Sequence, residues 1–366
     1  NLPNPNLKWE QTAQTNIGWD LGFFDGRLNI GGDFYYKKTT DLFTNVDVSP
    51  INGITSYIMN NGDMLNKGFS ISLNGYPVKT KNFRWYMSTY YSVNLNKVQT
   101  DDARNYNLND YLNGTAVVSG QPISTFYSYK FLGLNPQNGA PMFDDWEDRW
   151  HLLQGKTLDE VVPMILVNSG TRDPKFSGDL NNTFTYKNWS LSLNFSYSLG
   201  SKVRLFEMYG PIINGISAAA NVREEFLDRW QVPGDEKYTV YPLIISPSSP
   251  DYEHYRLHYS APQRAVGPNS GVPAFANNVW QMYDDSDLRV VSGNYLKLQS
   301  LSFSYRLNDR LLRKTPFTQL SISFNTHNCF TISAKELRGQ DPSQAGFADA
   351  GLSIRPSYTI GLNVSF

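Results

Sequence analysis

The sequence predicts an all-β fold, a transmembrane antiparallel β-barrel, and three observations favour it. Apolar and polar residues alternate along many segments, which gives each strand one apolar and one polar face. Short and long connections between these segments alternate strictly along the chain. No apolar run approaches the length of about 18 residues that a membrane-spanning helix needs.

The last strand shows the alternation most clearly. From Ile354 to the end, every even position except Pro356 is apolar or aromatic, every odd position is polar or small, and the chain stops at Phe366. One face of this strand therefore meets an apolar environment, which is either the core of a soluble sheet or the lipid around a barrel. The strand alone does not decide between the two.

The same period recurs in earlier segments and predicts a series of hairpins. Asp25 and Gly26 predict a tight turn, and a phase slip at Gln299 and Ser300 predicts a β-bulge. Wet faces rich in Ser and Asn are unusual for a soluble sheet, which favours Lys, Glu and Thr there. The expected strands cover 13–23, 28–37, 69–73, 83–95, 184–186, 189–199, 301–307, 320–330 and the C-terminal segment.

The connections between these strands fall into two classes. The short ones cover 25–27, 77–82, 187–188 and roughly 308–316, and the long ones cover roughly 39–67, 96–177, 200–288 and 333–352. Strict alternation places all long connections at one end of the sheet. Outer-membrane barrels have short periplasmic turns and long extracellular loops, so we expect the long connections to be extracellular.

The count of about nine strands has a consequence, because single-chain bacterial barrels have an even number and must close to leave no edge in lipid. The first strand must also run toward the periplasm if the last one is to end there. We therefore expect a partner strand before Asn1, with this chain forming the C-terminal part of a larger barrel.

Charge and reactive residues exclude several function classes. The chain has 32 Lys and Arg against 33 Asp and Glu, so no basic field predicts nucleic-acid binding. The four His residues form no catalytic constellation, and the Pro- and Tyr-rich surroundings of His254 and His258 argue against a helix that would pair them on a metal. The acidic runs 144–148 and 284–287 lack the spacing of a calcium loop and are expected to be solvated. We expect no catalytic residues, no metal and no cofactor.

Aromatic residues in the long connections are candidates for substrate binding, because sugars stack on Trp and Tyr. They are Trp146, Trp150, Trp230, Tyr238, Tyr241, Trp280 and Tyr283. The alternative is that they form small cores of the loops or contact a capping partner. Segment 221–230 predicts a short helix that packs Val222, Phe226, Leu227 and Trp230 on one stripe.

Six segments resemble the C-terminal barrel of the SusC/RagA family of TonB-linked outer-membrane proteins. They are 4–12, 28–41, 120–123, 126–130, 295–305 and 358–366. The resemblance implies a Gram-negative outer-membrane protein that is not an enzyme, with a 22-stranded barrel, an N-terminal plug and TonB as its energy source. It also implies a SusD-like surface lipoprotein as partner and the import of oligosaccharides or peptides. The plug and the TonB box are expected outside this sequence.

The final residues also resemble the signal that the barrel-assembly machinery reads. That signal combines a polar residue, a Gly two positions later, an apolar residue three positions after that, and a terminal aromatic. Here these would be Thr359, Gly361, Val364 and Phe366.

Two other functions remain compatible with the sequence. One is a soluble or surface glycan-binding β-sandwich without transport, in which the apolar faces would form the core. The other is a small self-contained porin or adhesin, which needs an even number of strands that close within this chain.

Overall fold

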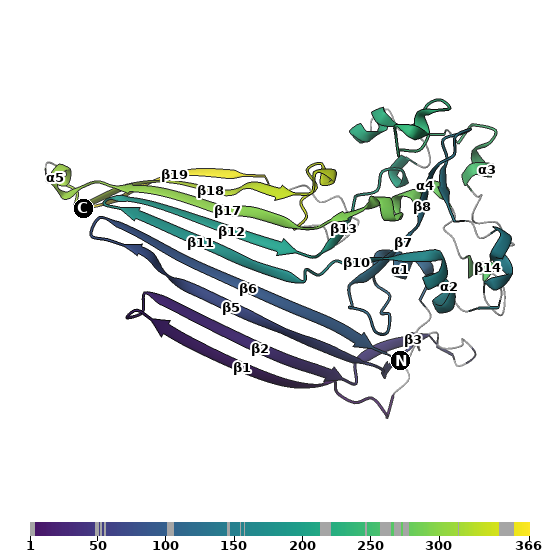
Figure 1. Ribbon diagram of the computed structural model, residues 1–366, viewed down its shortest axis with the longest axis horizontal. Coiled ribbons are helices and arrows are strands. Elements are labelled where there is room, and N and C mark those ends of the chain that lie inside the picture. The colour runs from purple at the N-terminus through teal and green to yellow at the C-terminus, as the bar shows by residue number, and fades with distance from the viewer. Residues whose placement is uncertain are drawn as a thin grey trace.

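The computed structural model of the protein describes most of the chain (Figure 1). The described residues are 4–47, 51, 53–54, 56–100, 106–144, 147–153, 155–156, 158–212, 221–245, 247–256, 265–266, 272–273, 278–313, 315–343 and 355–366.

Nine antiparallel strands form the main sheet, and they neighbour one another in the order in which they occur in the chain. Figure 1 shows them as one curved layer with short turns at one end and the long connections at the other. The predicted antiparallel β architecture is confirmed. The strands are β1 Gln11–Phe23, β2 Leu28–Thr40, β5 Asp63–Lys79, β6 Phe83–Gln99, β11 Phe176–Tyr186, β12 Trp189–Leu199, β17 Tyr295–Arg306, β18 Gln319–Ser333 and β19 Ser357–Ser365.

The turn between β1 and β2 illustrates how the sequence sets a hairpin. Asp25 and Gly26 both have positive φ, 54° and 77°, and the Arg27 N–H donates to the Phe24 carbonyl at 3.2 Å. A two-residue turn with these angles has the twist of the flanking strands. Asp-Gly favours such a turn because both residues tolerate positive φ. The predicted turn is confirmed.

The register aligns residues of one kind across the sheet. One cross-strand row is polar or small throughout: Gly22, Asn29, Asn74, Ser88, Asn181, Asn194, Ser300, His327 and Ser357. Another is apolar throughout: Val78, Trp85, Phe184, Leu191, Phe303, Phe324 and Ile360. The alternation seen in single strands thus extends over the whole sheet, which has one polar and one apolar face.

The short-turn end of the apolar face carries a row of aromatic residues. Phe83, Tyr186, Trp189 and Tyr305 pair in succession across four strands. The rings of Trp189 and Tyr305 lie 4.2 Å apart between centroids. Such aromatic rows mark the interfacial girdle of outer-membrane barrels.

The predicted bulge is confirmed at Gln299. Leu298 and Ser300 pair with adjacent residues of β12, Phe195 and Asn194, so that Gln299 has no partner there. Side chains point to alternate faces of a strand. Because Gln299 is an extra residue, the apolar side chains before it and after it point to the same face of the sheet.

The described strands form an open sheet. Its outer strands β1 and β19 do not pair with each other, so the described residues form no closed barrel. The other sheets among these residues have two strands each, so no second large sheet is available to pack on the apolar face of the main sheet. Large apolar side chains there are exposed, with Ile17 at 63% and Ile360 at 79%. Among the described residues, neither the sandwich nor the self-contained barrel is formed.

Helices and short strands occupy the connections. The short connections are 24–27, 80–82, 187–188 and 307–318, and the long ones, which we call the first to fourth loops, are 41–62, 100–175, 200–294 and 334–356. In the part of the chain that the structure describes, no helix has the length and apolar character to cross a membrane. The shorter elements are β3 Phe43–Asp47, β4 Ser56–Asn60, α1 Leu108–Asn113, β7 Thr125–Tyr129, β8 Phe131–Leu134, β9 Pro141–Phe143, η2 Glu147–Leu152, α2 Leu158–Ile165, β10 Leu166–Thr171, β13 Lys202–Arg204, η3 Gly210–Ile212, η4 Glu224–Asp228, η5 Asp235–Lys237, α3 Tyr252–Arg256, β14 Ala265–Val266, β15 Val272–Pro273, α4 Val279–Asp284, η7 Asp287–Arg289, β16 Val290–Ser292, α5 Asp309–Leu312 and η8 Lys335–Leu337.

Candidate functional site

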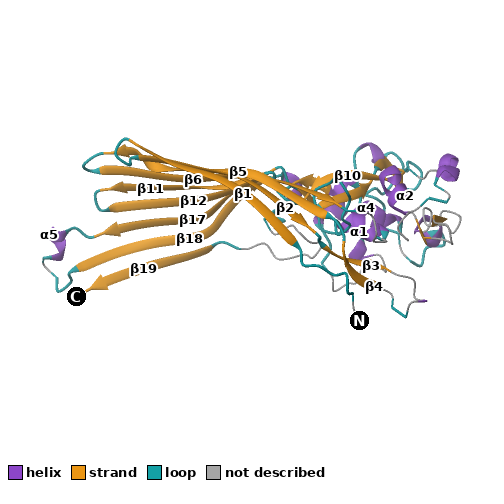
Figure 2. Cartoon of the chain, turned by 90° about the horizontal axis from the view of Figure 1, so that it is seen from below, coloured by secondary structure: helices purple, strands orange, loops and turns teal. Residues whose placement is uncertain are grey.

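The main buried core of the described residues lies in the second and third loops, beyond one end of the sheet (Figure 2). Its members come from α1, α2, α4 and the β7/β10 pair, with further residues from the loop segments around them. We call this group the loop core: Leu108, Tyr111, Leu112, Ala116, Tyr127, Tyr129, Phe143, Leu153, Val161, Val162, Ile165, Leu166, Met208, Tyr209, Phe226, Tyr252, Val279, Trp280, Met282 and Tyr283. The two loops therefore fold as one packed body.

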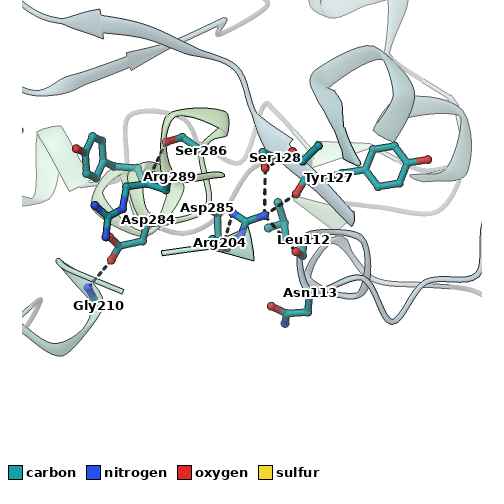
Figure 3. A network of polar contacts seen from close by, with 12 residues as sticks. Leu112, Asn113, Tyr127, Ser128, Arg204, Gly210, Asp284, Asp285, Ser286 and Arg289 are labelled. Atoms are coloured by element: carbon teal, nitrogen blue, oxygen red, sulfur yellow. Dashed lines mark hydrogen bonds and ion pairs between the residues drawn. The ribbon is translucent and has the colours of Figure 1, made fainter. Parts of the chain in front are cut away.

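Arg204 joins the third loop to the second (Figure 3). Its guanidinium lies 3.1 Å from the Asp285 carboxylate and donates to the carbonyl oxygens of Leu112 and Tyr127 at 3.2 and 2.7 Å. It also donates to the Ser128 hydroxyl at 3.1 Å. A planar guanidinium satisfies several acceptors at once, which suits it to bind two chain segments together.

Asp284 organises the start of η3 from the end of α4. Its carboxylate accepts N–H groups of Met208, Tyr209 and Gly210 at 2.8 to 2.9 Å. Burial raises the pKa of Asp284 to about 6, although Arg289 and these N–H donors act to lower it. Burial likewise raises the pKa of Asp285 to about 6, against the lowering effect of Arg204.

The fourth loop is tied to the third loop and to the sheet. Leu337 packs on Val203 and Leu205, and the Gln340 amide accepts the Phe206 N–H at 3.1 Å. Lys297 of β17 pairs with Asp341 at 3.0 Å, and both side chains are buried. The second, third and fourth loops thus form one connected layer beyond the long-connection end of the sheet, which we call the loop layer.

A cavity of about 390 Å³ lies between the third and fourth loops. Tyr283 and Arg289 contribute to its wall, and the Tyr283 hydroxyl and the Arg289 Nε–H are buried without a hydrogen-bond partner among the described residues. Buried polar groups normally have partners, so these two atoms mark the cavity as a candidate binding site. Its lining residues are Leu205, Glu225, Val240, Tyr241, Tyr283, Leu288, Arg289, Val291, Lys335, Glu336 and Arg338.

A second cavity, of about 400 Å³, lies between the β8/β9 hairpin and α3, and Met142, Phe143 and His254 contribute to its wall. Its polar side chains are engaged locally: Asp144 accepts from Arg149 at 2.6 and 2.8 Å, and Asn138 accepts the Ala140 N–H at 3.0 Å. It therefore offers a ligand fewer free polar groups than the first cavity.

The loop aromatics expected to bind substrate are placed in different environments. Trp230, Trp280 and Tyr283 are buried, the last two in the loop core, and Tyr241 packs against that core. Tyr241 and Tyr283 also line the first cavity. Tyr238 is 90% exposed. Trp146 lies outside the described residues, and Trp150 belongs to η2. Most of the placed aromatics therefore contribute to packing within the loops.

The helix expected over 221–230 is corrected by the structure. The segment contains the 3₁₀ helix η4, with Phe226 and Trp230 buried, whereas Val222 and Leu227 are exposed, Leu227 at 73%. The 3₁₀ helix covers only Glu224–Asp228, so Val222 and Trp230 lie outside it and no continuous α-helical stripe extends over the segment. The stripe was derived from the α-helical period and was wrong for Val222 and Leu227.

Expectations for the ionisable residues are corrected in two places. His254 does lie in a helix, α3. The N–H of the neighbouring Tyr255 donates to the Asp251 carbonyl at 3.1 Å, which is the hydrogen bond of a helical turn. His258 is outside the described residues, among which no cluster suited to a metal ion occurs. The acidic run 284–287 was expected to be solvated, yet Asp284 is buried and Asp287 accepts the Phe131 N–H at 2.9 Å.

The four residues of the assembly signal belong to β19 and the residue that follows it. Thr359, Gly361 and Val364 pair with β18 residues, and the ring of Phe366 lies 5.3 Å from that of Phe317. The strand is the outer strand of the described sheet, so its other edge is open to a partner.

Sequence reasoning missed Arg204 and Arg289. Each stands alone in its segment with no motif around it, and its partners lie up to 92 residues away. No local pattern could have indicated their roles.

Comparisons with known proteins agree with this architecture. The family model described as TonB dependent receptor-like, beta-barrel matches residues 1–223. TonB-dependent receptor P3 of Formosa agariphila is 25% identical over 99% of the chain and 35% of its own length. TonB-dependent receptor SusC of Bacteroides thetaiotaomicron is 30% identical over 58% of the chain and 21% of its own length. The chain spans about a third of the length of the relatives that match it in full, with coverages of 35% and 36%.

A solved structure of the RagAB peptide transporter shares the fold. It superposes with a TM-score of 0.70 at 20% identity, over 100% of this chain and 36% of the other. At this identity the likeness concerns the fold alone.

Proposed function

The chain belongs to the TonB-dependent receptor-like β-barrel family of outer-membrane transporters, and we propose that its sheet forms the C-terminal part of an importer's wall. The observation that carries the proposal is the two-faced sheet with every long loop at one end. An exposed apolar face of this extent is stable in lipid and not in water. Members of this family are transporters rather than enzymes.

In the proposed barrel the open edges of β1 and β19 pair with strands supplied by the rest of the receptor. Unpaired backbone groups cost several kcal/mol each in hydrocarbon, so lipid requires closure. The relatives' greater length supports such additional strands. The polar row that contains Asn181 and Asn194 then faces the lumen, and the apolar row that contains Phe303 faces lipid.

We place the loop layer on the extracellular side, where it meets the cargo and a SusD-like surface lipoprotein. Exposed apolar side chains on it, among them Leu132, Leu227 and Val232, support a docking role, since such side chains favour burial by a partner. The energy would come from TonB through other parts of the receptor.

The proposed cargo is an oligosaccharide or a peptide. The resemblance of the sequence to the SusC/RagA family implies these two classes, and the fold shared with the RagAB peptide transporter is in keeping with the second. The 390 Å³ cavity and the exposed Tyr238 offer binding groups on the loop layer. The roles of the seven loop aromatics in substrate binding remain part of this proposal.

The test is uptake of labelled oligosaccharides and peptides by cells that carry the full-length receptor, with and without functional TonB. We expect uptake of one class, dependent on TonB and on the cognate lipoprotein. Equal uptake without TonB would indicate a passive pore, and binding without uptake would indicate a surface receptor. Either result would contradict the proposal.

A further inference from the structure

We propose that the cavity between the third and fourth loops binds a carboxylate group of the cargo, held by Arg289 and Tyr283. The inference rests on the proposed import function and adds a chemical preference to it. The carboxylate would come from a uronic acid of an acidic oligosaccharide or from the C-terminus of a peptide.

Arg289 is a buried cation with no carboxylate oxygen within 4.0 Å in the described part of the chain. Arg289 is 3% exposed, and its Nη2 donates to the Phe206 carbonyl at 2.7 Å. Asp284 lies close enough to feel its charge, but the Asp284 oxygens accept three backbone N–H groups instead. Burying an unpaired charge is costly, so an anion in the cavity would stabilise this arrangement.

Tyr283 supplies a second buried donor in the wall of the same cavity. The residue is fully buried, its hydroxyl has no partner among the described residues, and the Arg289 Cζ lies 6.0 Å from its ring centroid. A carboxylate has two oxygens, so once the side chains that cover these two atoms move aside it can accept from the Arg289 Nε–H and from the Tyr283 hydroxyl.

Counted with Arg289, the cavity wall carries one more cationic residue than carboxylates. It contains three cationic residues, Arg289, Lys335 and Arg338, and two carboxylates, Glu225 and Glu336. Arg223 pairs with Glu225 at 2.6 Å and so neutralises one of the negative charges. Lys335 and Arg338 are exposed, where they can attract an anion toward the cavity.

The experiment measures binding by calorimetry to the purified full-length receptor. The probes are trigalacturonate and its methyl ester, and trialanine and its C-terminal amide. We expect the acid form of one pair to bind about tenfold more tightly than its neutral form, as for a hydrogen-bonded charge pair. The pair that shows the difference identifies the source of the carboxylate.

Two variants separate binding from folding. Arg289→Gln should abolish the preference for the acid form. Tyr283→Phe removes a hydroxyl that has no protein partner, so we expect an equal or higher melting temperature together with several-fold weaker binding of the acid form. Exposed Arg149→Gln is the matched control, which should retain the preference.

Equal affinity for acid and neutral forms in both pairs would overturn the inference. So would a Tyr283→Phe variant with undiminished acid binding, which decides the matter even if Arg289→Gln fails to fold. Because this assay needs no TonB, its failure is distinct from a failure of import. A receptor that imports neutral cargo but shows no acid preference would contradict the carboxylate site alone.

Discussion

The Arg204 guanidinium lies 3.1 Å from the Asp285 carboxylate, at a point where the third loop meets the second. The pair is largely buried, and Arg204 also holds two carbonyl groups of the second loop. The loop layer therefore depends on a polar contact at its centre as well as on its apolar core.

Replacing this arginine should loosen the loop layer. Arg204→Met removes the hydrogen bonds and leaves Asp285 without its cation, which we expect to cost about 3–5 kcal/mol in local stability. Hydrogen exchange of residues 112–129 in the full-length receptor measures the loss. The exposed pair Arg149–Asp144 provides the control, since Arg149→Met should cost less than about 1 kcal/mol. Equal exchange in both variants would contradict the role of Arg204.

The buried carboxylates predict that loop stability depends on pH. With pKa values raised to about 6, folded Asp284 and Asp285 bind more protons than the unfolded chain between about pH 4 and pH 6. Their contribution to the free energy of unfolding therefore falls as pH rises through this range, by about 1.4 kcal/mol per unit of each shift. Hydrogen exchange of residues 208–210, compared at pH 4.5 and 7, should show the lower stability at pH 7.

The variant Asp284→Asn isolates this contribution from other titrating groups. It should flatten part of the pH dependence, and it should open residues 208–210 at every pH because an amide accepts fewer N–H groups. Asp287→Asn, which alters a neighbouring carboxylate, is the comparison. If the stability of residues 208–210 in the wild type rises between pH 4.5 and 7, the predicted direction of the pH dependence is wrong.

Phe366 should affect assembly rather than stability. If Phe366 is read by the barrel-assembly machinery, Phe366→Ala should lower the amount of folded receptor in the outer membrane several-fold. Heat-modifiable migration on gels measures the folded fraction, and Ser365→Ala is the adjacent control. Unchanged levels of folded Phe366→Ala receptor would leave the segment with a purely structural role.

Much of the sheet could be predicted from sequence because the facing of a strand is a local property. The alternation over 189–199 gave the bounds of β12, and the phase slip gave the bulge at Gln299. The loops follow no such period. Asp284 was expected in water because its N–H donors lie 74 to 76 residues away and no local pattern connects them.

The two faces of the sheet predict opposite responses to charge at adjacent positions. Leu193 shares the apolar face with Leu191, whereas Asn194 belongs to the polar row, and both lie near the middle of β12. Leu193→Arg should cost about 2–4 kcal/mol of folding free energy in lipid, and Asn194→Arg much less. Unfolding by denaturant in phospholipid vesicles compares them. Similar costs at both positions would argue against a lipid-facing surface.

A spin-label scan along β12 determines which face of the sheet meets lipid. Labels placed singly from Leu191 to Tyr197 in the full-length receptor, reconstituted in lipid, report accessibility to oxygen and to a water-soluble nickel complex. We expect oxygen maxima at 191, 193, 195 and 197 and nickel maxima at the residues between them. An absent or inverted alternation would contradict the assignment of this sheet as the wall of an outer-membrane barrel.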